Sequence, residues 1–234
     1  MLAPPSTTVA AMITVHHLNN SRSQRILWLL EELGVEYTVK RYERDAKTML
    51  APPELKHVHP LGKSPVITDG RQTLAESGAI IEYLADKYGQ ETALAPAADS
   101  AERVRYSYWL HYAEGSAMPP MLMSLIMSKI KTAPMPFFVR PIAKAIADKA
   151  MSGFIGPQIK LHLGYMNDEL GKHPWFVAKK FTAADIQMSF PIEAAAARAG
   201  LDAYPNTKAW LAKIQSRPAY QRALEKGGPY ELMR

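Results

Sequence analysis

The sequence predicts an α/β domain followed by an all-α domain. Between residues 13 and 88, short segments with strand-like alternation are interspersed with segments of helical apolar spacing. After a stretch that contains Pro96, almost every segment to the end has helical composition. The chain has 234 residues, 47% of them hydrophobic, enough for one large core or two modest ones. We therefore expect a tail without a secretory signal over 1–11, an α/β domain over 12–92, a linker over 93–98 and a helical domain over 99–234.

The first domain is predicted to run strand, helix, strand, hairpin and helix. Two strands and the helix between them come first, and the hairpin is indicated by the turn residues Asp69-Gly70-Arg71. The predicted segments are Ile13–Leu18, Arg25–Leu33, Tyr37–Tyr42, Ser64–Thr68, Gln72–Leu74 and Ser77–Tyr88. This order implies a thioredoxin-like fold with a right-handed crossover between its first two strands.

The second domain is predicted to contain two long, bent helices. The first spans about Ser100–Ile130 and should bend near Pro119 and Pro120, because proline removes a backbone donor and clashes with the preceding turn. The second spans about Phe138–Leu170, with a bend near Pro157. Further along, Thr182 followed by Asp185 predicts a structural capping box at the start of another helix.

Composition excludes several classes of function. The absence of cysteine removes disulfides, thiolate metal sites and any catalytic thiol of the protein itself, and it fits a cytoplasmic location. No apolar run approaches the roughly 18 residues of a membrane span, and no metal-ligand spacing occurs. The net charge of +6 comes from the second half, but its cations lack the interleaved aromatic residues of a nucleic-acid platform. We expect no nucleic-acid partner.

The most informative stretch runs from His59 to Ile67 and is followed by Glu76-Ser77 at a helix start. Pro65 opens an apolar strand, where its missing N–H is tolerated and where a cis bond would expose the backbone of Ser64. Glu76 offers a carboxylate, and Ser77 offers a hydroxyl and a helix-starting N–H. Together these groups suit the ammonium and carboxylate of an amino acid or a peptide-like ligand.

This pattern, His-Pro-Leu-Gly-Lys-Ser-Pro-Val-Ile and then Glu-Ser before Ala79–Leu84, resembles the glutathione site of the cytosolic glutathione S-transferases, in particular a bacterial and fungal type. The resemblance implies glutathione as co-substrate, no metal, and a homodimer. It also implies that the backbone of Ser64, before the cis-proline Pro65, pairs with the cysteine of glutathione and that Glu76 and Ser77 hold its γ-glutamyl end. Lys63 is expected to face the glycine carboxylate.

The chemistry requires a group that stabilises the glutathione thiolate, because a free thiol with a pKa of about 8.5 is mostly protonated at neutral pH. The loop 19–23 leads into a helix N-terminus that would favour the anion. Counting back from Arg25 puts Asn20 where serine-type relatives carry their hydroxyl, with Ser21 one place later. We favour Ser21 as the catalytic residue, keep Asn20 as the alternative donor, and count Arg22 as a third residue near the cofactor.

A pocket for an apolar electrophile is expected between the two domains. Aromatic and thioether side chains of the first long helix, above all Tyr108, Tyr112 and Met118, are its predicted lining. His16 and His17 lie on the first strand, one expected to face the core and one the surface, and neither is assigned to catalysis.

The leading hypothesis is a homodimeric glutathione transferase that conjugates apolar electrophiles and also reduces organic hydroperoxides. The alternatives are a non-catalytic module that binds glutathione or apolar ligands, and a glutathione-dependent disulfide reductase that uses two bound glutathiones.

Overall fold

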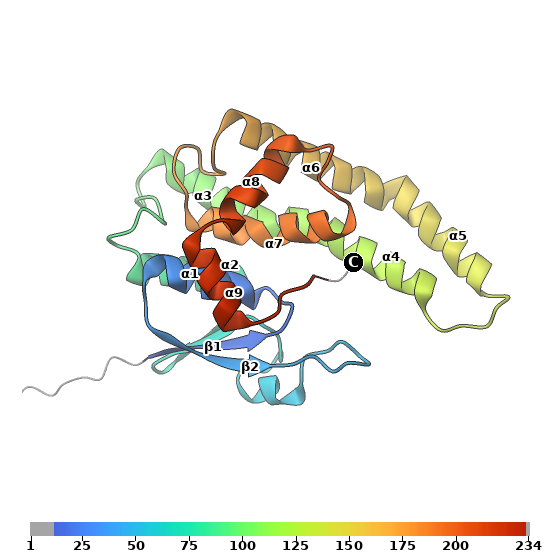
Figure 1. The fold of residues 1–234 in the computed structure, drawn as a ribbon, viewed down its shortest axis with the longest axis horizontal. Coiled ribbons are helices and arrows are strands. Elements are labelled where there is room, and N and C mark those ends of the chain that lie inside the picture. The colour runs from blue at the N-terminus through green and yellow to red at the C-terminus, as the bar shows by residue number, and fades with distance from the viewer. Residues whose placement is uncertain (1–11, 233–234) are drawn as a thin grey trace, which may run out of the picture.

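The computed structural model describes residues 12–232 and contains one four-stranded mixed sheet (Figure 1). Its strands are β1 (Ile13–Leu18), β2 (Tyr37–Tyr42), β3 (Val66–Asp69) and β4 (Gln72–Ala75), in the order β2-β1-β3-β4. β1 is parallel to β2, and β3 is antiparallel to both β1 and β4. The expected tail over 1–11 lies outside the described residues.

Two helices lie between the sheet and the rest of the molecule. They are α1 (Ser23–Leu33) and α2 (Ser77–Tyr88), and in Figure 1 both lie on the side of the sheet that faces the helical half. α1 buries an almost continuous apolar stretch from Ile26 to Leu30, and it ends at Gly34, whose φ of 66° is left-handed and suits glycine. A short 3₁₀ helix, Pro53–His57, follows β2 and buries Leu55 beside Leu18 and Tyr42.

The two predicted long helices are both interrupted by a π-helical turn. α3 (Ala101–Tyr112) continues through Ala113–Ala117 into α4 (Met118–Thr132), and α5 (Arg140–Ala150) continues through Met151–Ile155 into α6 (Gly156–Lys172). An irregular turn lies near each expected bend, but in the first helix it precedes the prolines. Pro119 and Pro120 lie in the first turn of α4, directly after the π-helical turn. Figure 1 shows α4 and α5 extending from the body as an arm.

The last three helices complete the helical half. They are α7 (Ala183–Arg198), α8 (Pro205–Gln215) and α9 (Pro218–Gly227). α7 is buried over most of its length, and α9 packs against α1. The predicted capping box is confirmed at the start of α7, where the Thr182 N–H donates to Asp185 Oδ2 at 3.0 Å. Among residues 12–232, no helix is long and apolar enough to cross a membrane.

The expectation that one of the two histidines of β1 faces the surface is wrong. His16 and His17 are both buried, because each face of β1 is covered at this end by residues from distant segments. His16 Nδ1 lies 3.0 Å from the Tyr42 hydroxyl on one face. On the other face His17 contacts Ser23 and the backbone of Gly227.

Candidate active site

The predicted site residues converge where β3 begins and the N-termini of α1 and α2 meet it. The Ser64–Pro65 peptide bond is cis. The Ser64 hydroxyl donates to the His16 carbonyl at 3.1 Å and lies 3.5 Å from Ser21 Oγ. The loop before α1 therefore lies directly beside the loop before β3.

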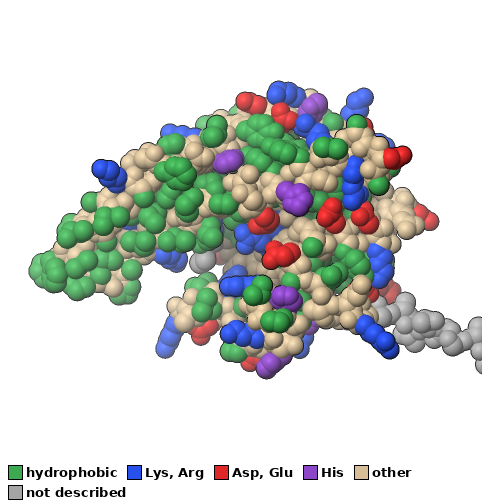
Figure 2. Space-filling view, turned by 180° about the vertical axis from the view of Figure 1, so that it is seen from behind, with side chains coloured by type: hydrophobic (Ala, Val, Ile, Leu, Met, Phe, Trp, Pro, Cys, Tyr) green, Lys and Arg blue, Asp and Glu red, His purple; other side chains and the backbone are tan. Residues whose placement is uncertain are grey.

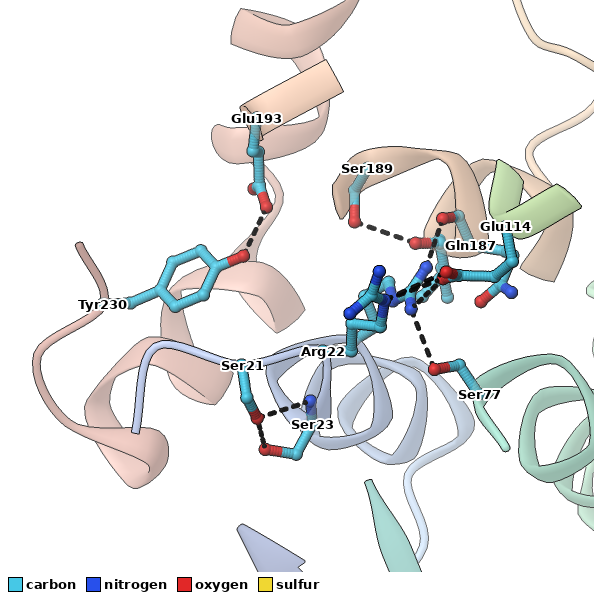
Figure 3. Close-up of polar contacts among 11 residues, drawn as sticks. Ser21, Arg22, Ser23, Ser77, Glu114, Gln187, Ser189, Glu193 and Tyr230 are labelled. Carbon is cyan, nitrogen blue, oxygen red and sulfur yellow. Dashed lines mark hydrogen bonds and ion pairs between the residues drawn. The ribbon is translucent and has the colours of Figure 1, made fainter. Parts of the chain in front are cut away.

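Ser21 belongs to a buried chain of hydroxyls. Its Oγ shares a 2.8 Å hydrogen bond with Ser23 Oγ and accepts from the Ser23 N–H (Figure 3), and Ser23 Oγ lies 2.9 Å from His17 Nδ1. Burial and, to a smaller extent, the charge of Arg41 lower the pKa of His17 to about 4, although a hydrogen bond with the Gly227 backbone partly offsets them. The imidazole is therefore neutral at pH 7.

The side chain of Asn20 accepts one hydrogen bond and keeps unused donors within the described residues. Its backbone has a φ of 48°, an uncommon conformation that asparagine tolerates. Its Oδ1 accepts from the Glu231 N–H at 2.7 Å, so the C-terminal segment crosses the loop at this point. The amide NH₂ has no hydrogen-bond partner among residues 12–232, and it remains available as a donor.

The C-terminal segment itself was not anticipated from the sequence. The Tyr230 hydroxyl donates to Glu193 on α7 at 2.7 Å, and the Tyr220 hydroxyl donates to the other oxygen of the same carboxylate at 2.6 Å (Figure 3 shows the Tyr230 contact). Burial raises the pKa of Glu193, although both phenols oppose this shift. No local signal in residues 228–232 indicates that they fold back to Asn20.

Glu76 and Ser77 stand at the start of α2 in contrasting environments. Glu76 has a φ of 71°, a strained backbone for a residue with a side chain, and its carboxylate is exposed with no protein partner in the described range. Ser77 is 4% exposed, and its hydroxyl accepts from Arg25 Nη2 at 2.9 Å. The site thus combines an unpaired anion with a fixed hydroxyl and free N–H groups at a helix start.

An arginine pair and one glutamate lie behind these residues, and sequence reasoning missed the glutamate. Arg22 Nε donates to Glu114 Oε2 at 3.0 Å, and Arg25 Nη2 donates to Glu114 Oε1 at 2.7 Å (Figure 3). Arg22 also lies over the Phe190 ring, 4.8 Å from its centroid. The structure therefore brings Arg22 to Glu114, between the two domains.

The remaining predicted residues are more scattered. Lys63 is exposed, and its ammonium has no partner within 12–232. Tyr108 and Tyr112 stack with ring centroids 5.6 Å apart, and the Tyr112 hydroxyl lies 2.7 Å from His162 Nδ1. Met118 is buried at the start of α4. Three cavities of about 430, 480 and 670 Å³ lie elsewhere and are lined by other residues.

Comparison with known proteins identifies the family to which this fold belongs. The family model of the glutathione S-transferase N-terminal domain matches residues 10–86, and that of the C-terminal domain matches residues 133–227. The chain is 38% identical over 225 residues to glutathione S-transferase 1 of Saccharomyces cerevisiae, covering 92% of this chain and 95% of the relative. The chain therefore belongs to the glutathione S-transferase family, with a thioredoxin-like domain followed by a helical domain.

Solved structures agree in architecture. A glutathione S-transferase from Actinobacillus pleuropneumoniae is 35% identical, with a TM-score of 0.74 and coverage of 92% of this chain and 93% of that one. A family member from Pseudomonas fluorescens, solved with two glutathione molecules bound, is 28% identical, with a TM-score of 0.74 and coverage of 94% and 95%. The disulfide-bond oxidoreductase YfcG of Escherichia coli is 27% identical over 224 residues, covering 92% of this chain and 95% of the relative.

Proposed function

We propose that this protein binds glutathione at the Ser64–Pro65 and Glu76–Ser77 framework and activates its thiol for transfer to an apolar electrophile. The observation that carries the proposal is the unpaired Glu76 carboxylate on a strained backbone, next to the fixed Ser77 hydroxyl. Strained residues with unused polar groups are typical of binding sites. Membership of the family supports the same assignment.

Each part of glutathione has a proposed partner. The γ-glutamyl ammonium pairs with Glu76, and the γ-glutamyl carboxylate accepts from the Ser77 hydroxyl and from N–H groups at the start of α2. The cysteinyl backbone pairs with Ser64. The glycine carboxylate lies near Lys63, whose ammonium has no other partner in the described chain.

Hydrogen-bond accounting favours Asn20 over Ser21 as the donor to the sulfur. The Gly227 backbone bonds to one nitrogen of neutral His17, so we assign the proton to that nitrogen, Nε2, and Nδ1 accepts from Ser23. Ser23 has only one hydroxyl proton, so the hydrogen bond it shares with Ser21 uses the proton of Ser21. Ser21 then has no proton for the thiolate, whereas the Asn20 amide retains both of its own.

The proposed reaction needs no sulfur from the protein, which contains no cysteine. The thiolate forms a C–S bond with the electrophile, and the leaving group departs with its electron pair while the thiol proton passes to solvent. With an organic hydroperoxide, the thiolate attacks oxygen and the O–O bond breaks. The products are an alcohol, formed by protonation from solvent, and glutathione sulfenic acid, which reacts with a second glutathione to give the disulfide and water.

A glutathione-dependent disulfide reductase is the second candidate. It is favoured by the likeness to the Escherichia coli oxidoreductase and to the Pseudomonas fluorescens protein with two bound glutathiones. Because this chain has no cysteine, both sulfurs of the exchange would come from glutathione. A module that binds glutathione without turnover is the remaining alternative.

We further propose that the protein is a homodimer. Its support is the exposed apolar surface of the arm, where Figure 2 shows hydrophobic side chains gathered at the left. The apolar side chains of α4, α5 and α6 that are 46–65% exposed include Leu122, Ile126, Ile142, Ile146 and Leu161. Light scattering should give twice the mass of one 26.0 kDa chain, and Ile126→Glu should give the monomer.

Turnover distinguishes the candidate functions. Purified protein should conjugate a chloronitrobenzene, and cumene hydroperoxide and a mixed glutathione disulfide are tested in parallel. Reduction of the mixed disulfide alone would favour the reductase. Glutathione binding without any of the three reactions would favour the binding module. Failure to bind glutathione at millimolar concentration would overturn the proposal.

A further inference from the structure

Arg25 is a buried cation at the junction of the two domains. Its side chain is 1% exposed, and its guanidinium contacts three segments that are distant in sequence. Nη1 donates to the Gln187 carbonyl of α7 at 2.6 Å, and Nη2 donates both to Ser77 on α2 and to Glu114. Figure 3 shows Ser77, Glu114 and Gln187 turned toward one point from three elements.

Glu114 is the acidic residue that pairs with this buried cation. Desolvation of Glu114 would raise its pKa, but the charges of Arg25 and Arg22 outweigh that effect and lower it, so the carboxylate is ionised at pH 7. Glu114 lies in the π-helical turn Ala113–Ala117. Such a turn adds a residue to the helix and re-aims the side chains around it, and π turns are frequent at functional sites.

We infer that Glu114 is a positioning residue for glutathione. It acts through Arg25, which it holds in the orientation that donates to the Ser77 hydroxyl. The inference rests on the proposed function, because Ser77 is the proposed partner of the γ-glutamyl carboxylate. A neutral residue at 114 would remove the carboxylate that hydrogen-bonds to Arg25, and the guanidinium would no longer fix Ser77.

The chain offers a matched pair that serves as a control for a purely structural role. Within the helical half, Arg105 donates to Glu169 at 2.6 Å and to the Phe176 carbonyl at 2.7 Å, and Lys172 donates to the same glutamate, which thus pairs with two cations as Glu114 does. The Glu169 side chain is 11% exposed, less than the 32% of Glu114. Glu169→Gln therefore breaks a comparable ion pair that does not contact Ser77.

The test is a double-mutant cycle on glutathione binding with Glu114→Gln, Ser77→Ala and the double variant. Calorimetric titration of the folded proteins should show each single variant binding about tenfold more weakly than wild type. The double variant should bind no more than about threefold more weakly than Ser77→Ala alone, because both changes act through one hydroxyl. Glu169→Gln should stay within about twofold of wild type. In turnover, Glu114→Gln should raise KM for glutathione and leave kcat at saturating glutathione within about threefold.

Two results would overturn the inference while leaving the proposed function intact. One is wild-type affinity in folded Glu114→Gln, and the other is multiplication of the two single effects in the double variant. Should Glu114→Gln not fold, Glu114→Asp retains the charge but is too short to reach both arginines, so intermediate affinity supports the inference and wild-type affinity contradicts it. Absence of glutathione binding in the wild type would overturn both.

Discussion

Replacing Glu76 by alanine should separate binding from stability. The carboxylate is exposed and has no partner within the described residues, so its loss should change the free energy of unfolding by no more than about 0.5 kcal/mol. A φ of 71° is as unfavourable for alanine as for glutamate, so the substitution leaves the backbone strain unchanged. Any large effect must then appear when a ligand binds.

The expected loss of affinity follows from the bond that would be removed. A charge-assisted hydrogen bond between an ammonium and a carboxylate is worth about 1.5–3 kcal/mol, and the exposure of Glu76 places it at the lower end. A loss of about 1.5–2 kcal/mol corresponds to glutathione binding about 12- to 30-fold more weakly.

Calorimetric titration with two ligands tests this assignment. One is glutathione, and the other is the analogue that carries a glutaryl group in place of γ-glutamyl and therefore lacks the amine. Glu76→Ala should weaken only the first, whereas Glu82→Ala, at a partly buried residue on the same helix that pairs with Arg103, should weaken neither. Equal weakening for both ligands, or glutathione affinity within about twofold of wild type, would refute the reasoning.

Three further predictions concern the thiolate, a buried histidine and the capping box. Asn20→Ala should raise the pKa of the bound glutathione thiol by about one unit, and Ser21→Ala should raise it by less. Thiolate absorbance as a function of pH measures this pKa, and a larger effect of Ser21→Ala would favour Ser21 as the donor. The pKa of His17 is about 4 in the folded state and about 6.5 when unfolded, so protonation favours the unfolded chain. The free energy of unfolding should therefore fall by up to about 3 kcal/mol between pH 6.5 and 4. Urea titrations of His17→Gln should not show this fall. Asp185→Ala should lower the free energy of unfolding by about 3 kcal/mol, because it leaves the N–H groups of Phe176 and Thr182 and the Trp210 indole N–H without their acceptor. A decrease of less than about 1 kcal/mol in urea unfolding would contradict this prediction.

The sheet domain could be predicted from the sequence because its signals are local. Alternation predicted β1 and β2 with the bounds observed, and Gly34 and the turn at Gly70 punctuate the chain. The capping box of α7 was equally readable, because Thr182 and Asp185 are three residues apart. The cis bond at Pro65 likewise follows from a motif of a few residues.

The parts that could not be predicted depend on distant contacts. His16 and His17 alternate along β1, yet both are buried because Tyr42 and Gly227 cover opposite faces. Nothing near Glu114 indicates that it faces the two arginines, since the contact spans 89 residues. The choice between Asn20 and Ser21 similarly depends on the contact of His17 with the Gly227 backbone, from near the other end of the chain.

The most direct test of the proposed site is a crystal structure of the protein with glutathione. We predict the γ-glutamyl ammonium at Glu76, the γ-glutamyl carboxylate at Ser77, the cysteinyl backbone against Ser64, and the sulfur within hydrogen-bond distance of the Asn20 amide. Glutathione bound away from Glu76 and Ser77, or a sulfur that contacts Ser21 and not Asn20, would contradict the corresponding part of the assignment.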